Sequence, residues 1–103
     1  MELNEYQRKA LKSLAIPSKD IQALAHRTLG LAGEAGETAN IIKKMVRDKS
    51  GIPTDDDIQE IAEKLGDTLY YIAVLAEYFA FDLEEIAQKN LYKSDAFRKA
   101  RVA

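Results

Sequence analysis

The sequence contains no cysteine, no tryptophan, a single histidine and no long run of apolar residues. Without cysteine the chain cannot form a disulfide, a thiolate zinc site, an iron–sulfur cluster or a cysteine nucleophile. His26 alone is too little for a histidine-built metal site, and we expect it to be a surface or packing residue. No apolar stretch reaches the roughly 18 residues of a membrane span, and no leader pattern opens the chain. We therefore expect a soluble, cytoplasmic protein with no membrane partner.

The charges of the chain are nearly balanced, with 17 Asp and Glu against 15 Lys and Arg and a formal net charge of −2. That balance does not favour binding to a nucleic-acid polymer. A length of 103 residues gives room for one domain with a modest core, so we expect a single domain over residues 1–103. Small helical chains often gain stability by oligomerising. With cysteine and histidine excluded, carboxylates are the side chains left for chemistry.

The apolar residues recur at helical spacing, whereas alternating strand patterns with hairpin turns are absent. Capping residues and one loop signal, Ser50-Gly51-Ile52-Pro53, predict helices over about residues 5–15, 19–48, 55–80 and 83–98. The expected capping residues are Asn4 with Gln7, Ser18, Thr54, and Asp82 with Glu85. The predicted fold class is all-α, a small four-helix bundle completed by oligomerisation.

Two acidic pairs lie where solvated carboxylates are not expected. At about 100° per residue, Glu34 and Glu37 fall within a stripe of apolar and small residues. Glu63 and Asp67 lie opposite the expected core stripe of the third helix, on a face that continues into apolar side chains. That core stripe is Ile58, Ile61, Ala62, Leu65, Leu69, Ile72 and Ala76. Buried carboxylates are costly unless paired or metal-bound, so the four acids can share one or two Mg²⁺ ions.

Surface pairing is the alternative for these acids. Glu34, Glu37 and Glu63 can instead form ion pairs with nearby basic residues. The candidate basic partners are Arg27, Lys43, Lys44 and Lys64. The run Asp55-Asp56-Asp57 follows Thr54 and is better explained by helix capping than by a metal. Tyr70 and Tyr71, next to Asp67, either stack on a nucleotide base or belong to the core.

Three glycines in the second predicted helix need an explanation. Gly30, Gly33 and Gly36 recur at three-residue spacing, and each costs up to about 1 kcal/mol relative to alanine inside a helix. Close approach of another backbone or of a ligand accounts for them. A break of the helix near Gly33 is the alternative.

Two segments together resemble a known family. Gly33-Glu34-Ala35-Gly36-Glu37 precedes Asn40, Lys43 and Lys44, and Lys64-Leu65-Gly66-Asp67 precedes Leu69-Tyr70-Tyr71. Asp82-Leu83-Glu84-Glu85-Ile86, leading to Asn90 and Lys93, completes a pattern over roughly residues 20–93 that resembles the MazG-like nucleoside triphosphate pyrophosphohydrolases. The resemblance implies an all-α enzyme that uses Mg²⁺, with Mn²⁺ as a possible substitute, and that assembles as a dimer or tetramer. Such enzymes split a nucleoside triphosphate into the monophosphate and pyrophosphate.

The resemblance also assigns roles to residues. It implies that Glu34, Glu37 and Asp67 are metal ligands, that Lys44 and Lys43 contact phosphate oxygens, and that Asn90 and Lys93 contact the nucleotide. The chain departs from the family pattern at two places: the motif E-x-x-D requires an acid where this chain has Lys64, and the arginine that often follows the family lysine is displaced to Arg98. Either Glu63 takes that acid's place, or the site holds its metal with fewer ligands beside a lysine. The rival hypothesis is a non-catalytic helical interaction module whose acidic pairs form salt bridges.

Overall fold

The structure is a computed structural model, which describes the backbone of residues 1–102 and the side chains of residues 1–96 and 98–100. Its helices are α1 (Leu3–Leu11), α2 (Ile21–Lys49), α3 (Asp55–Tyr78) and α4 (Leu83–Val102). No strand occurs within residues 1–102, so the predicted all-α class is confirmed. In this part of the chain, none of the helices is both long and apolar enough to span a membrane.

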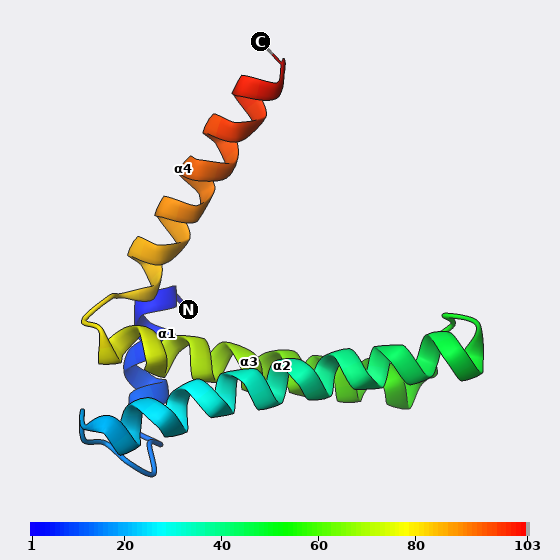
Figure 1. The fold of residues 1–103 in the computed structure, drawn as a ribbon, viewed down its shortest axis with the longest axis horizontal. Coiled ribbons are helices and arrows are strands. Elements are labelled where there is room, and N and C mark those ends of the chain that lie inside the picture. Colours follow the sequence, from blue (N-terminus) through cyan, green and yellow to red (C-terminus); the bar gives the residue numbers. More distant parts are fainter. Residues whose placement is uncertain (103) are drawn as a thin grey trace.

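Helices α2 and α3 form a long antiparallel pair (Figure 1). The predicted loop joins them, because Ser50 ends α2 in the left-handed conformation (φ 55°) and Gly51 continues it (φ 77°). The backbone N–H of Gly51 then donates to the carbonyl oxygen of Met45 at 3.3 Å, which satisfies an end carbonyl of α2. Helix α2 is continuous through Gly33, so the alternative of a break there is wrong.

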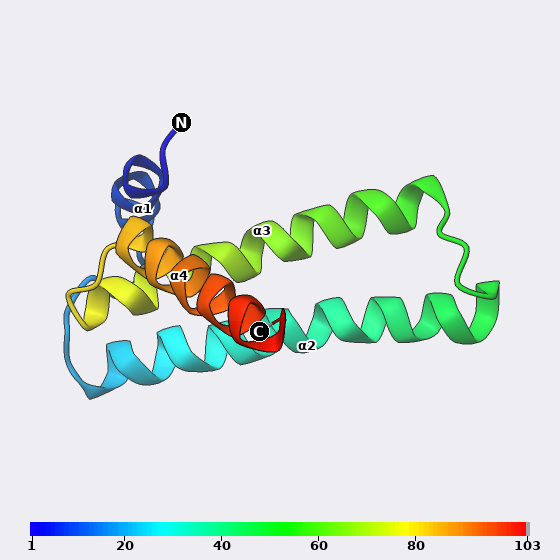
Figure 2. The ribbon, with the colours of Figure 1, turned by 90° about the horizontal axis from the view of Figure 1, so that it is seen from above.

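Helices α1 and α4 lie at the other end of this pair, where α1 packs against α3 and α4. After its first turns α4 projects away from the layer formed by α2 and α3 (Figure 1), and Figure 2 shows it from above. The radius of gyration is 16.6 Å, whereas about 13 Å is typical of a compact chain of this length. The predicted bundle therefore consists of a helix pair, a short cross-helix and a projecting helix.

The predicted capping box of α1 is wrong. Asn4 does not cap α1, which starts after Glu2; its Oδ1 instead accepts from the Glu84 N–H at 3.0 Å, at the start of α4. Gln7 is buried, and its Nε2 donates to the carbonyl oxygens of Ala73 and Phe81, each at 3.0 Å. Both side chains are held by backbone groups of α3, of the turn after it and of the start of α4, so they are not available to cap α1.

Of the other three predicted caps, one is wrong and two are confirmed. Helix α2 is capped by Asp20, whose Oδ1 accepts from the Ala23 N–H at 2.9 Å, and not by the predicted Ser18. The Thr54 cap of α3 is confirmed as a reciprocal capping box with Asp57. Asp82 also acts as predicted, since its Oδ1 accepts from the Glu85 N–H at 2.7 Å. The two confirmed caps, Thr54 and Asp82, both bond to residues within the first turn of their own helix.

The core lies mainly beside the predicted stripe of α3 and shares only Ala76 with it. Ala73 and Val74 are fully buried, and they join Ala10, Ala76 and Leu83 with the partly buried Tyr6, Leu11, Leu14, Tyr70 and Tyr71. The predicted core stripe is largely exposed: Ile58 and Leu65 are each 55% exposed, and of that stripe only Ala76 belongs to the buried core. The reason is that α4 projects away, so among the described residues that face of α3 is covered only near the first turns of α4.

Candidate active site

The first acidic pair meets a lysine across the interface between α2 and α3. Lys64 Nζ lies 2.6 Å from Glu37 Oε2 and 3.4 Å from Glu34 Oε2. The side chains of Lys64 and Glu34 are 27% and 24% exposed, whereas that of Glu37 is 58% exposed. The three charged groups therefore form a half-buried cluster, which we call the Glu34–Glu37–Lys64 cluster.

Helix geometry explains why Lys64 reaches the glutamates and Glu63 does not. Successive residues of a helix point about 100° apart, so the two side chains leave α3 in different directions. A threonine lies one turn further along each helix from the cluster. Thr38 Oγ1 donates to the Glu34 carbonyl oxygen and Thr68 Oγ1 to the Lys64 carbonyl oxygen, each at 2.8 Å. Each hydroxyl thus donates within its own helix and does not take part in the ion pairs of Lys64.

The charge of the lysine is reinforced by its partners. The hydrogen bond to Glu37 raises the pKa of the Lys64 ammonium above its usual value, and the charges of Glu34 and Glu37 act in the same direction. The ammonium therefore stays protonated at neutral pH, and the cluster carries two negative charges and one positive charge. Of the surface pairs considered as alternatives to a metal site, this is the one that forms.

The second acidic pair is separate from this cluster. Glu63 and Asp67 are both exposed on α3. The charge of Asp67 reaches as far as Tyr6, where it contributes, after burial and Tyr70, to a raised pKa of the phenol. Among the residues that the structure describes, no three His, Cys, Asp or Glu side chains gather as a metal-binding group. The four-carboxylate metal site stays a prediction.

The residues expected to contact substrate lie on three helices. Lys43 and Lys44 are exposed on α2, one to two turns beyond the acidic pair. Tyr70 is half-buried against the core, with its ring edge-on to Tyr71 at a centroid distance of 5.1 Å. Lys93 is exposed on the projecting α4.

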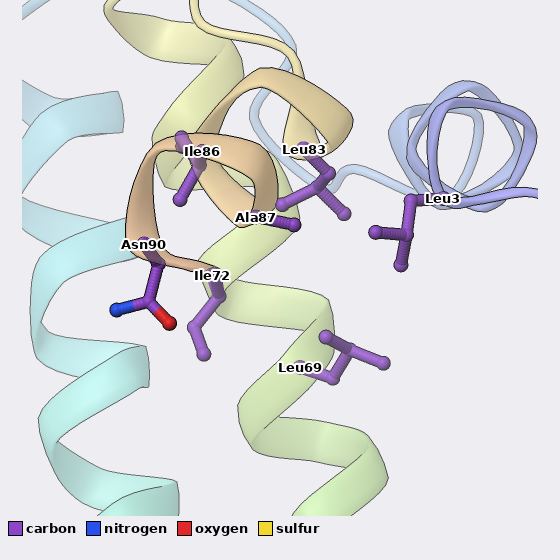
Figure 3. Close-up of a pocket in the computed structure, with 7 residues that line it drawn as sticks. All are labelled: Leu3, Leu69, Ile72, Leu83, Ile86, Ala87 and Asn90. Carbon is purple, nitrogen blue, oxygen red and sulfur yellow. The ribbon is translucent and has the colours of Figure 1, made fainter. Parts of the chain in front are cut away.

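Asn90 lies at the edge of an apolar pocket (Figure 3). The other lining residues are Leu3, Leu69, Ile72, Leu83, Ile86 and Ala87. They come from α1, α3 and the first turns of α4, and the Asn90 amide is the polar group among them. Asn90 is therefore placed beside apolar surface, on a different part of the molecule from Lys43 and Lys44.

His26 and the acidic run after Thr54 were both predicted to have no catalytic role. The acidic run behind Thr54 acts in capping, and Asp57 also pairs with Lys49 at 2.8 Å. His26 is exposed, with its ring 6.2 Å from that of Tyr71, as expected of a surface or packing residue.

A buried arginine was not foreseen. Arg27, expected as a possible surface partner of the glutamates, is fully buried. Its Nη1 donates to the Val74 carbonyl oxygen at 2.7 Å and to Glu77 Oε2 at 2.9 Å. The available signal was its place on the stripe of α2 that also holds Glu34, where a charged residue needs a partner from a facing helix. Arg27 is thus a structural residue that joins α2 to α3.

Comparisons with known proteins agree with this architecture. Residues 22–101 match the family model of the MazG nucleotide pyrophosphohydrolase domain. A relative named Gene 37 protein, from Mycobacterium phage L5, is 42% identical over 73 residues. That match covers 71% of this chain and 64% of the phage protein, so the chain spans less than two thirds of that relative. No solved structure matches the chain significantly. With most of its length matched by the family model, the chain belongs to the MazG nucleotide pyrophosphohydrolase family.

Proposed function

We propose that this protein is a metal-dependent nucleoside triphosphate pyrophosphohydrolase, which converts an NTP or dNTP to the monophosphate and pyrophosphate. The observation that carries the proposal is the Glu34–Glu37–Lys64 cluster, because it lies within the residues matched by the family model. Removal of non-standard nucleotides from the cytoplasmic pool is a role that fits this reaction. We propose that residues 1–103 form a single domain.

The carboxylates suit a hard divalent cation. Glu34 and Glu37 offer oxygen ligands on one side of α2, and the Lys64 ammonium already touches both of them. One cationic group can therefore reach both carboxylates, as Mg²⁺ binding by one or two carboxylates together with substrate phosphates requires. In the proposal Glu63 and Asp67 complete the ligand set from α3, and Mn²⁺ is an alternative metal. When bound, the metal supplies charge neutralisation and activation of water.

Other residues of the chain handle the substrate. A glutamate left outside metal coordination would accept the proton of the attacking water. Lys43 and Lys44 would offset the phosphate charge, which is greatest on the leaving pyrophosphate. Asn90, Lys93 and Tyr70 would contact the nucleoside. Each of these assignments is testable by substitution.

A second function is favoured by one observation. The Lys64 ammonium satisfies both glutamates without any metal, as a non-catalytic helical interaction module with salt-bridged acids would need. The two functions make opposite predictions about turnover.

Pyrophosphate release from a panel of NTPs and dNTPs, with Mg²⁺, with Mn²⁺ and with chelator, separates the two functions. We expect metal-dependent turnover of at least one nucleotide. Glu37→Gln removes one ligand charge and should lower kcat/KM by at least about a hundredfold, a typical effect of losing a catalytic carboxylate. Glu63→Gln and Asp67→Asn test the two predicted ligands on α3 in the same assay.

Glu5→Gln is the matched control for these variants. It makes the same change of charge in an ordinary surface pair with Lys9 on α1, so it should keep wild-type activity. Absence of turnover with every nucleotide and both metals, with wild type equal to Glu37→Gln, would reject the enzyme and favour the interaction module.

The surface of the chain supports assembly as a homodimer or homotetramer. The chain exposes 7490 Å², whereas a compact monomer of its 11.5 kDa mass would expose about 5,800 Å². The excess of roughly 1,700 Å² is the amount that one subunit of an obligate dimer buries. Part of the exposed surface is an apolar face of α3, on which Leu65 is 55% exposed and Leu69 and Ile72 are 38% and 37% exposed. A second copy would cover this face.

Size-exclusion chromatography with light scattering tests the assembly. We expect wild type at a multiple of 11.5 kDa and Leu65→Glu at a lower mass, because a charge in an apolar interface is strongly unfavourable. Gln59→Glu, at an exposed position on the same helix, is the control and should assemble normally. A wild-type monomer at micromolar concentration would contradict the proposal.

A further inference from the structure

The ammonium group of Lys64 lies between the two carboxylates that a metal ion would bind. Its side chain crosses the helix interface, instead of extending into solvent as lysines usually do, and its Nζ contacts one oxygen of each glutamate. An ammonium carries three donors and no acceptor, so it can bind carboxylate oxygens but cannot bind a metal. The lysine and a metal ion therefore compete for the same oxygens.

The net charge of the Glu34–Glu37–Lys64 cluster limits its binding of a divalent cation. Glu34 and Glu37 together carry two negative charges, enough to neutralise one divalent cation. With Lys64 in place one negative charge remains, and one oxygen of each carboxylate is engaged by the ammonium. Glu63 and Asp67 are exposed on the same helix as Lys64, so a cation held by these two acids would also meet the positive charge of the lysine.

We propose that Lys64 is a resident cation of this site and replaces one divalent ion, so that the chain binds one metal ion fewer than its four carboxylates would otherwise hold. This inference rests on the proposed function, since it concerns the same carboxylates. The rival is a mobile lysine that swings into solvent when metal arrives and leaves both glutamates to the metal.

Binding of Mn²⁺ alone distinguishes these two possibilities without any turnover. Free Mn²⁺ is counted by electron paramagnetic resonance in titrations of the full chain, for wild type and for Lys64→Gln. We expect Lys64→Gln to bind one additional Mn²⁺ per chain, because the competing charge is gone, whereas a mobile lysine would leave the number of bound ions unchanged and alter only the affinity. Lys64→Arg keeps the charge and should behave as wild type.

Two controls test for effects of net charge and of folding. Lys12→Gln removes the same charge from an exposed residue just after α1 and should leave Mn²⁺ binding unchanged, which separates the local effect from that of net charge. Circular dichroism of each variant reports whether the helices are retained.

Equal numbers of bound Mn²⁺ in wild type and Lys64→Gln, whether or not the affinities differ and including no binding by either, would overturn the proposal. Failure of the proposed function looks different. In that case no nucleotide is hydrolysed, while Lys64→Gln still gains Mn²⁺ binding over wild type.

Discussion

Gly30 is the one glycine of α2 that packs against another side chain of the described structure. A Cβ added at Gly30 would lie 2.6 Å from Tyr71 Cδ1 and closer still to Cε1 and Cζ. Carbon atoms normally approach no nearer than about 3.5 Å. The Tyr71 ring has little room to retreat, because it packs edge-on against Tyr70 at 5.1 Å and His26 at 6.2 Å. Gly30→Ala therefore forces the ring or the helices to move.

The same substitution at Gly33 and Gly36 provides matched controls, since nothing lies within 4 Å of a Cβ at either position. Overpacking costs about 1–3 kcal/mol, and alanine returns up to about 1 kcal/mol of helix propensity. We expect Gly30→Ala to lose about 1–2 kcal/mol of unfolding free energy, whereas each control gains about 0.5–1 kcal/mol. The same residue type on the same helix should thus give opposite signs.

Urea and thermal unfolding followed by circular dichroism measure these changes, at one fixed chain concentration so that any assembly contributes equally. For a domain of this size, about 1 kcal/mol corresponds to roughly 4–8 °C in Tm. Gly30→Ala as stable as Gly33→Ala would refute the close contact with Tyr71. A loss of stability in all three variants would instead place another surface over Gly33 and Gly36.

Three further outcomes follow from polar contacts. Glu77→Ala leaves the buried guanidinium of Arg27 without its carboxylate partner, and we expect a loss of about 2–3 kcal/mol in urea unfolding. Although burial raises it, hydrogen bonds from Lys19 and Arg27 hold the pKa of Glu77 below its usual 4.5. The stability that Glu77 contributes is therefore complete above pH 4.5 and is lost as the pH falls through the lower folded pKa, so unfolding of wild type and Glu77→Ala should converge in acid. Asn4→Ala removes the acceptor of the Glu84 N–H and should cost about 1 kcal/mol, with faster hydrogen exchange at Glu84.

Local signals predicted the helices well. Apolar periodicity and the Ser50–Pro53 loop gave α2 and α3 to within two residues at each end, and Thr54 was correctly placed as a cap. Such signals depend on residues within one turn of each other, so the sequence contains them completely. The caps at Asn4 and Ser18 were wrong because another group, remote or neighbouring, competed for the same backbone contacts.

The two faces of α3 could not be distinguished from the pattern alone. Both faces are apolar between Leu69 and Ala80, and the choice depends on where α4 goes after Asp82. Glu34 and Glu37 lie beside α3, where they pair with Lys64, one of several basic partners that the sequence offered. Glu63 and Lys64 are adjacent in sequence, and only the rotation of α3 against α2 decides that Lys64 faces the pair.

The contacts of α1 also constrain the order in which the protein can form. Asn4 and Gln7 bind backbone groups of Ala73, Phe81, Leu83 and Glu84, which lie between 66 and 80 residues further along the chain. A chain made on the ribosome emerges from its amino terminus, so α1 leaves the ribosome before the partners of Asn4 and Gln7 are made. Helices α2 and α3 can pair during that interval, because one short loop joins them. Helix α1 is therefore synthesised well before the groups that its polar side chains contact.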